Sequence, residues 1–228
     1  MIADRGLDHP AWTSLQGVHA QFAQTHGDAA RYQPDVAPFV AVSDTPGSNV
    51  WADLLALVGA GGTATLIDPP QPWPAGWEVV GTGQGVQMVE ESVVGVHDAD
   101  AVELGAADVP EMLDLVARTK PGPFLPRTIE LGRYLGIRRD GRLVAMAGER
   151  VQPPGWTEIS AVCTDEAYRG HGLGARLVLA VAAGIHDRGD RAFLHALATN
   201  ATAIRLYESL GFVLRRTRAF TTVQLPAD

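Results

Sequence analysis

The feature that most constrains the fold of this chain is a glycine-rich turn at residues 164–174. The turn follows an apolar segment with strand character and opens an amphipathic helix, whose first turn leaves backbone amides free and carries partial positive charge. Glycines at positions 170, 172 and 174 remove side chains that would keep a phosphate away from those amides, and Arg169 adds a permanent cation. The turn therefore predicts an anion site sized for phosphate or pyrophosphate.

Other interpretations of the turn fit less well. A dinucleotide-binding loop needs G-x-G-x-x-G at the opening of a parallel sheet, whereas this turn has G-x-G-x-G and its strand follows a hairpin. A P-loop needs a Gly-Lys-Ser/Thr ending, which the turn lacks. A purely structural glycine turn stays open as an alternative when the turn is considered alone.

The elements around the turn predict a mixed α/β (α+β) sheet. Asp140-Gly141 is a hairpin signal between two strand-like segments. A strand–helix–strand crossover should make its two strands parallel. The expected strands are 101–104, 134–138, 142–149, 158–164, 192–198, 212–216 and 220–225, and the expected helices are 109–118, 173–187 and 200–210.

The first part of the chain has a different character. Residues 1–100 carry two arginines against twelve Asp and Glu, whereas residues 101–228 carry sixteen basic and fourteen acidic side chains. We expect a division into an N-terminal α/β half, residues 1–95, and a second domain, residues 101–228. Spacing in the first half predicts helices after Pro10 and after Asn49 and strands at 63–67, 77–80 and 86–89.

Composition argues against several classes of protein. The sequence contains no run of about 18 apolar residues, so it predicts no membrane span. The first residues do not resemble a signal peptide. The sequence contains no basic cluster with interleaved aromatic residues, which argues against nucleic-acid binding. It also contains no His, Cys and Asp at the spacing of metal ligands, so it predicts no metal site. The single cysteine, Cys163, cannot form an internal disulfide, so we expect a cytoplasmic protein.

Two motifs resemble a known family. Arg169-x-x-Gly172-x-Gly174 is similar to the Arg/Gln-x-x-Gly-x-Gly/Ala signature of the GCN5-related N-acetyltransferases (GNAT), and the run from Ile159 to Ala175 is similar to their FR47-like subgroup. The second motif runs from Asn200 through Tyr207 to Gly211-Phe212. The resemblance covers about residues 101–225. It implies the GNAT fold, an acyltransferase that uses acetyl-CoA as cosubstrate, and an N-terminal half that is a degenerate partial copy or a stabilising cap.

The resemblance also implies roles for residues at the motif positions. Backbone groups of Val162 and Thr164 would pair with the pantetheine arm, Asn200 would contact the arm, and Tyr207 would protonate the leaving thiolate. The amides of the turn would hold the pyrophosphate, and these belong to Arg169, Gly170, His171, Gly172, Leu173 and Gly174. The expected reaction is direct transfer of an acetyl group to a primary amine of a small molecule or peptide, by a monomer or homodimer.

The remaining chemistry must be assigned from the residues themselves. A carboxylate acting through water could take the proton of the amine. Glu149 and Glu158 are candidates because both lie on strands expected to line the cleft, and Glu158 is favoured. Cys163 is expected to be a buried thiol rather than a nucleophile, and His195 a satisfied core histidine rather than a base. The alternative function is a non-catalytic acyl-CoA-binding or regulatory module of the same fold.

Overall fold

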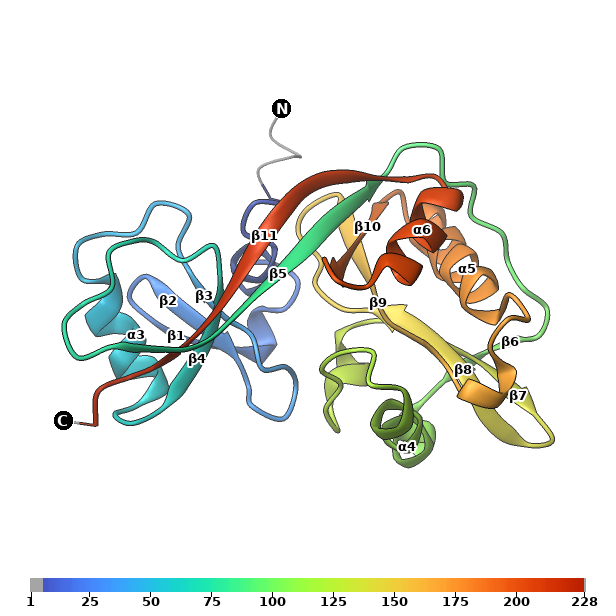
Figure 1. Cartoon of the computed structure of the whole chain (residues 1–228), viewed down its shortest axis with the longest axis horizontal. Coiled ribbons are helices and arrows are strands. Elements are labelled where there is room, and N and C mark those ends of the chain that lie inside the picture. Colours follow the sequence, from blue (N-terminus) through green and yellow to red (C-terminus); the bar gives the residue numbers. More distant parts are fainter. Residues whose placement is uncertain (1–5, 228) are drawn as a thin grey trace.

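The computed structural model describes residues 6–227, which form two sheets and the helices packed on them. A small sheet has the order β1-β2-β3, and a large one has the order β4-β11-β5-β10-β9-β8-β7-β6. The large sheet contains antiparallel pairs and one parallel pair, so the predicted mixed α/β sheet is confirmed. Figure 1 shows the small sheet at one end of the molecule and the helices α4, α5 and α6 at the other.

The elements have the following bounds. The α-helices are α2 Pro10–Leu15, α3 Val50–Val58, α4 Val109–Thr119, α5 Leu173–Asp187 and α6 Ala201–Ser209, and short 3-10 helices are η1 Ala20–Phe22, η2 Ala106–Asp108, η3 Thr128–Leu131 and η4 Glu166–Tyr168. The strands are β1 Ala23–His26, β2 Ala29–Tyr32, β3 Val40–Val42, β4 Thr63–Ile67, β5 Glu78–Glu90, β6 Ala101–Leu104, β7 Tyr134–Arg139, β8 Arg142–Glu149, β9 Trp156–Thr164, β10 Arg191–Leu197 and β11 Phe212–Gln224.

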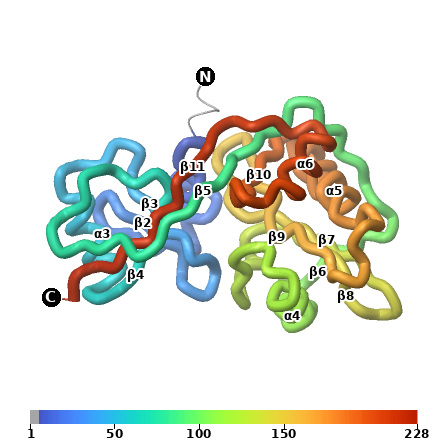
Figure 2. Tube along the Cα trace, in the orientation of Figure 1, coloured from blue at the N-terminus to red at the C-terminus, as the bar shows by residue number. Residues whose placement is uncertain are grey.

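Two long strands connect the ends of the molecule. β5 and β11 are each continuous over 13 residues and pair with each other from Phe212↔Glu90 to Gln224↔Glu78. Figure 2 shows the two segments running side by side along the molecule. The prediction of two separate strands in each of these segments is wrong. The glycines of β5 do not break it, because Gly85 lies under the ring of Phe220, where a Cβ would collide.

The crossover that carries the glycine-rich turn has the predicted topology. β9, α5 and β10 follow one another, and β9 pairs with β10 in parallel, as predicted. The pairing extends only from Trp156↔Arg191 to Ile159↔Leu194. Beyond Ile159 the two strands no longer pair, although β9 continues to Thr164 and β10 to Leu197. The sheet is therefore open at the point where the turn begins.

The N-terminal part differs from the sequence-based expectation in two respects. The helix after Pro10 ends at Leu15, since a 3-10 helix and then β1 follow. Strands β1, β2 and β3 were not predicted, because they are three or four residues long and too short to show a clear alternation. The helix after Asn49 and the strand β4 are confirmed.

β5 links the two parts of the chain, because it comes from the first half and belongs to the large sheet. The strands predicted near 77–89 form β5, which lies between β10 and β11 in the large sheet. β4 then adds to the outer edge of β11. The division at residues 95–101 stays a prediction, and a unit that contains the complete central sheet includes β5 as well as residues 101–228.

Candidate active site

A large cavity lies where β9 and β10 separate, and we call it the cleft. Its volume is about 720 Å³, within the range of small-molecule and cofactor sites. One wall is formed by residues 159–164 of β9, and another by the turn and the start of α5. Three residues from elsewhere also line the cleft: Phe39 from the segment before β3, Thr65 from β4 and Phe220 from β11. The cleft is therefore built from both parts of the chain.

The glycine-rich turn forms one end of the cleft. Gly172 is the N-cap of α5, has a left-handed backbone with φ 73°, and provides no side-chain cap for the first amides of the helix. Gly170 is also left-handed, and a Cβ at either glycine would stand in open space. No acidic residue lies in the first turn of α5. Arg169 and Leu173 line the same end, so the turn presents uncapped amides and a guanidinium to the cleft.

The edge of β9 also faces the cleft with its backbone. Asp165 donates its amide to the carbonyl of Val144 on β8. Because backbone groups alternate in direction along a strand, those of Val162 and Thr164 point to the opposite edge, which β10 has left. A register shift interrupts the β8–β9 pairing here, and Ala161 has φ 53°. Such a left-handed alanine is a strained conformation of the kind found at functional sites.

Tyr207 and Cys163 line the middle of the cleft. Both side chains are largely buried, at 7% exposure each. Burial, with a smaller contribution from Cys163, raises the pKa of Tyr207 to about 12. Burial likewise raises the pKa of the Cys163 thiol to about 11. The phenol therefore keeps its proton at neutral pH and can donate it, whereas the thiol is a poor nucleophile there.

Glu158 belongs to a buried ion-pair network. Its carboxylate, 1% exposed, accepts hydrogen bonds from Nε and Nη2 of Arg150, each at 2.8 Å, and lies 2.7 Å from Nδ1 of His195. Burial alone would raise the pKa of Glu158, but the charge and hydrogen bonds of Arg150, with His195, hold it well below its usual range. Arg150 and His195 line the cleft, and Glu158 does not. Its carboxylate is therefore poorly placed to accept a proton from a bound amine.

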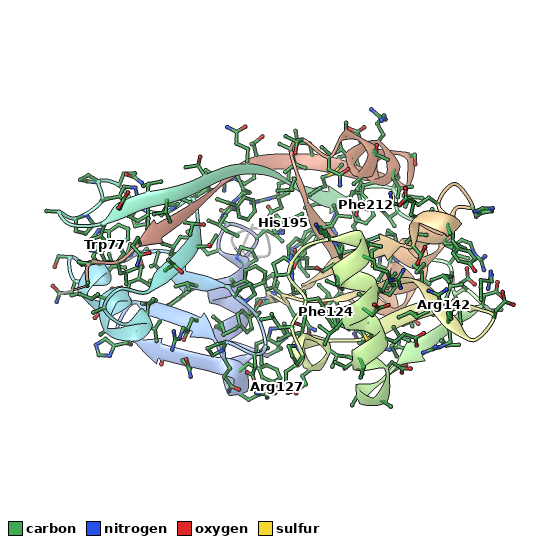
Figure 3. All side chains as sticks on the ribbon, turned by 60° about the horizontal axis from the view of Figure 1, so that its bottom comes forward. Trp77, Phe124, Arg127, Arg142, His195 and Phe212 are labelled. Carbon is green, nitrogen blue, oxygen red and sulfur yellow. The ribbon has the colours of Figure 1, made fainter. Side chains whose placement is uncertain are left out.

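The partners of His195 define which ring nitrogen carries the proton. An ionised carboxylate only accepts, so Nδ1 donates to Glu158. On the other side, Nε2 lies 3.2 Å from the amide nitrogen of Gln87. That nitrogen also donates to the carbonyl of Leu7, and Oε1 of Gln87 accepts from Arg215. Nε2 of His195 is therefore the unprotonated nitrogen. Figure 3 places His195 near the middle of the molecule, between Trp77 at one end and Arg142 at the other.

The other predicted residues occupy separate positions. Asn200 lines the cleft and caps α6, since its Oδ1 accepts from the amide of Ala203 at 3.1 Å. His171 is exposed, and its Nδ1 lies within hydrogen-bond distance of two backbone carbonyls of the turn. Glu149 is buried, pairs with Arg188 at 2.8 Å and does not line the cleft. Within residues 6–227, no Asp or Glu lines the cleft.

Several residues of the cleft had no signal in the sequence. Arg150 and Lys120 add cations to its walls, and Phe39 and Phe220 add aromatic rings. The ring of Phe39 stacks under the guanidinium of Arg150 at 4.7 Å. A residue of the N-terminal part reaches the site only because β4, β5 and β11 pair, which no local pattern reveals.

Comparisons with known proteins point to one family. The sequence model of the FR47-like protein family matches residues 134–221. An acetyltransferase of the GNAT family from Novosphingobium aromaticivorans is 41% identical, with a TM-score of 0.87 over 96% of this chain and 98% of that chain. A GCN5-related N-acetyltransferase from Kribbella flavida is 20% identical, with a TM-score of 0.61 over 100% of this chain and 96% of that chain, and so supports the fold.

Two curated relatives each match about half of the chain. N-alpha-acetyltransferase RimI of Mycobacterium tuberculosis is 33% identical over 129 residues, which are 50% of this chain and 80% of that protein. Mycothiol acetyltransferase of Thermomonospora curvata is 38% identical over 112 residues, which are 46% of this chain and 36% of that protein. The fold and the cleft define an acyltransferase. The chain belongs to the GNAT family of acetyltransferases, and it carries an FR47-like domain.

The part of the chain that the structure describes contains neither a metal centre nor a membrane-spanning helix. Over residues 6–227, no three His, Cys, Asp or Glu side chains gather as metal ligands would. Among the same residues, no helix combines the length and the apolar character needed to cross a bilayer.

Proposed function

We propose that this chain transfers the acetyl group of acetyl-CoA to a primary amine by direct attack within a ternary complex. The observation that carries the proposal is the cleft itself, which joins an uncapped helix N-terminus to an unpaired strand edge. A long ligand with phosphates at one end and an amide-containing arm fits this arrangement. Acetyl-CoA has this form and, when bound, supplies an activated acetyl thioester.

The residues that would hold the cosubstrate divide into three groups. The amides of residues 169–174 and the guanidinium of Arg169 would hold the pyrophosphate. Backbone groups of Val162 and Thr164 would pair with the pantetheine arm as an added strand. Asn200, which caps α6 at the rim of the cleft, would contact the arm. Among the described residues, those that line the cleft are either cationic or uncharged, which suits a polyanion.

Tyr207 would serve as the proton donor to the departing thiolate. Its raised pKa means that the phenol is protonated throughout the neutral range. Cys163 shares the wall but would form no covalent intermediate, because its raised pKa leaves little thiolate at neutral pH. These two assignments favour direct transfer, in which the enzyme gains chiefly by holding both reactants together.

The proton of the amine would pass to His195 rather than directly to Glu158. His195 lines the cleft, and its Nε2 lone pair, which faces the Gln87 amide at 3.2 Å, would take the proton once the bound amine displaces that contact. Glu158 would act as a positioning residue, because its carboxylate fixes the ring from the opposite side. This assignment replaces the carboxylate base favoured by the sequence. It follows from the burial of Glu158 and from its pairing with Arg150.

The primary test measures free-thiol release from acetyl-CoA against a panel of amines. We expect turnover by the wild type, and a fall in kcat of about 100-fold in Tyr207→Phe with little change in the KM for acetyl-CoA. Arg169→Glu should raise that KM about tenfold or more, whereas the exposed Arg205→Glu should not. Binding of CoA without turnover of any amine would instead support a non-catalytic acyl-CoA-binding module.

The role of His195 has its own test. His195→Gln should lower kcat about 100-fold, with the KM for acetyl-CoA and the stability unchanged. A structural histidine would lower stability but leave the kcat of the folded protein unchanged. Thermal unfolding of the variant, measured alongside, separates the two outcomes.

A further inference from the structure

A second cavity opens beside the cleft, and we call it the annex cavity. Its volume is about 210 Å³. It is enclosed by α2, β3, β4 and the middle of β11, and its walls are mostly carbon. Its large apolar side chains are Trp12, Phe39, Val42, Leu66, Ile67 and Phe220. α2, β3 and β4 lie outside residues 134–221, the part that the family model matches, whereas Arg218 and Phe220 of β11 lie near its end.

The annex cavity adjoins the cleft. Phe39, Thr65 and Phe220 line both cavities. Arg150, whose guanidinium lies over the ring of Phe39, and His195 also line the cleft. A ligand whose amine lies at His195 would enter the annex cavity by passing Phe39 and Phe220.

The ionisable side chains of the annex cavity leave its interior with little free charge. Arg218, 1% exposed, donates to the carbonyls of Leu7 and Asp8 and lies 2.8 Å from a carboxylate oxygen of Asp68. Burial lowers the pKa of His9, which favours an uncharged ring. Asp44 is exposed and lies at the outside of the cavity. The interior therefore favours an uncharged, apolar group over a charged one.

The size of the annex cavity limits what it can hold. A dry cavity of about 150 Å³ lined by aliphatic and aromatic side chains is large enough to bind benzene. At about 210 Å³, the annex cavity can hold one aromatic ring or a branched alkyl group. Three of its side chains, Trp12, Phe39 and Phe220, are aromatic and suit edge or face contacts with such a ring.

We infer that the acceptor of this enzyme is an amine with an aryl or branched alkyl group, and that this group occupies the annex cavity while the amine lies at His195. The inference rests on the proposed function, because it names the class of acceptor for that same site. The N-terminal part of the chain thereby acquires a role in specificity, since it provides most of the walls of the annex cavity.

The test compares phenethylamine with ethylamine as acceptors. Both are primary amines, and they differ in the ring. In the wild type, kcat/KM for phenethylamine should exceed that for ethylamine about tenfold or more. Ala41→Phe places a ring in the annex cavity and should remove this advantage while leaving the KM for acetyl-CoA unchanged. Ala117→Phe, the same substitution on an exposed position of α4, should preserve it.

A second variant and a direct measurement keep the inference testable. If Ala41→Phe does not fold by thermal unfolding, Ala11→Phe fills the same cavity from α2. Binding of 4-fluorophenethylamine, followed by fluorine NMR in the absence of acetyl-CoA, should be seen in the wild type and lost in either filled variant. This binding measurement tests the annex cavity even if no amine is acetylated, and an absence of turnover would count against the proposed function alone.

Three results would overturn the inference. The first is equal kcat/KM for the two amines in the wild type. The second is a preference for phenethylamine that survives in a folded Ala41→Phe variant. The third is a filled-cavity variant that loses activity with phenylacetyl-CoA as donor but keeps activity with phenethylamine as acceptor. That result would assign the annex cavity to the acyl group instead of the acceptor.

Discussion

At the scale of single residues, Tyr134 has an unusual environment. Its ring is fully buried against Phe124 and packs on Gly148, where any Cβ would collide with it. Its hydroxyl has no hydrogen-bond partner among the described residues. A buried, unpaired hydroxyl costs about 1–3 kcal/mol, and burial raises the pKa of Tyr134, so ionisation gives no relief.

We expect Tyr134→Phe to increase the free energy of unfolding by about 1 kcal/mol, because the variant loses only the unpaired oxygen. Tyr32→Phe is the matched control, since the hydroxyl of Tyr32 lies 3.0 Å from Nδ1 of His19. The control should lower the free energy of unfolding by about 1–3 kcal/mol. Urea unfolding measures both values. A Tyr134→Phe variant as unstable as Tyr32→Phe would show that the hydroxyl is paired.

His19 should make the stability depend on pH. It is buried, Nε2 donates to the carbonyl of Leu131, and burial lowers its pKa to about 4 from an ordinary value of about 6.5. Between these two pH values the unfolded chain binds a proton that the folded protein does not. Stability therefore falls as the pH decreases through this window, by about 2 kcal/mol between pH 6.5 and pH 5.

The measurement compares free energies of unfolding at pH 7.5 and pH 5 in the wild type and in His19→Gln. The variant removes the titrating ring but keeps a side chain that can donate to Leu131. Its stability should change less between the two pH values, by about 2 kcal/mol. The same pH response in both proteins would exclude His19 as its source.

The residues of the site were predictable only where a local motif carries them. The turn at 169–174 and Tyr207 could be named because their chemistry depends on short spacing in one strand–helix or helix segment. Glu158 was correctly located on β9, but its burial and its pairing with Arg150 are not local properties. His195 was expected to be a satisfied core histidine. It does have two partners, yet it also lines the cleft.

At the scale of elements, the start of α5 combines a left-handed glycine with the proposed phosphate site. Gly172 adopts φ 73°, and alanine in this left-handed region costs about 1–2 kcal/mol. Gly189 follows the other end of the same helix with φ 83°, and a Cβ would stand in open space at both positions. Both glycines therefore adopt a left-handed backbone with space for a methyl group, but of the two only Gly172 lines the cleft.

We expect Gly172→Ala and Gly189→Ala to lower the free energy of unfolding by similar amounts, about 1 kcal/mol each. Gly172→Ala should also raise the KM for acetyl-CoA about tenfold, because a methyl group would then stand at the uncapped amides. Gly189→Ala should leave that KM unchanged. Thermal unfolding and steady-state kinetics distinguish the two effects, and equal KM values would argue against phosphate binding at this turn.

Elements whose limits depend on tertiary pairing were the least predictable. α5 and α6 were located correctly, since each has a long apolar stripe and a glycine near its end. β5 and β11 were each divided in two because glycine, threonine and arginine interrupt their apolar pattern. They are continuous because each supplies backbone partners to the other along 13 residues, and this pairing outweighs the weak strand preference of glycine.

At the scale of the whole molecule, β11 is buried in two separate cores. Phe212, at its start, packs with the core under α5, and Val223, near its end, packs with Leu54 and Leu66 in the core under α3. β4 and β5 flank the far part of β11 on both sides. Loss of either core therefore removes backbone pairing from the other, and the two parts of the molecule should unfold as one cooperative unit.

Hydrogen exchange followed by mass spectrometry tests this coupling. Val223→Ala removes two buried methyl groups from the core under α3, where Val223 is 0% exposed, and should cost about 2 kcal/mol. If β11 couples the two cores, the free energy of opening should fall by the same amount in peptides from β4 and from β8, although β8 lies at the other end of the molecule. Val80→Ala, at a 52% exposed position on β5, should change neither. A fall confined to β4 would mean that the two parts unfold independently, and the C-terminal part would then keep the β9 and α5 walls of the cleft while the N-terminal part opens.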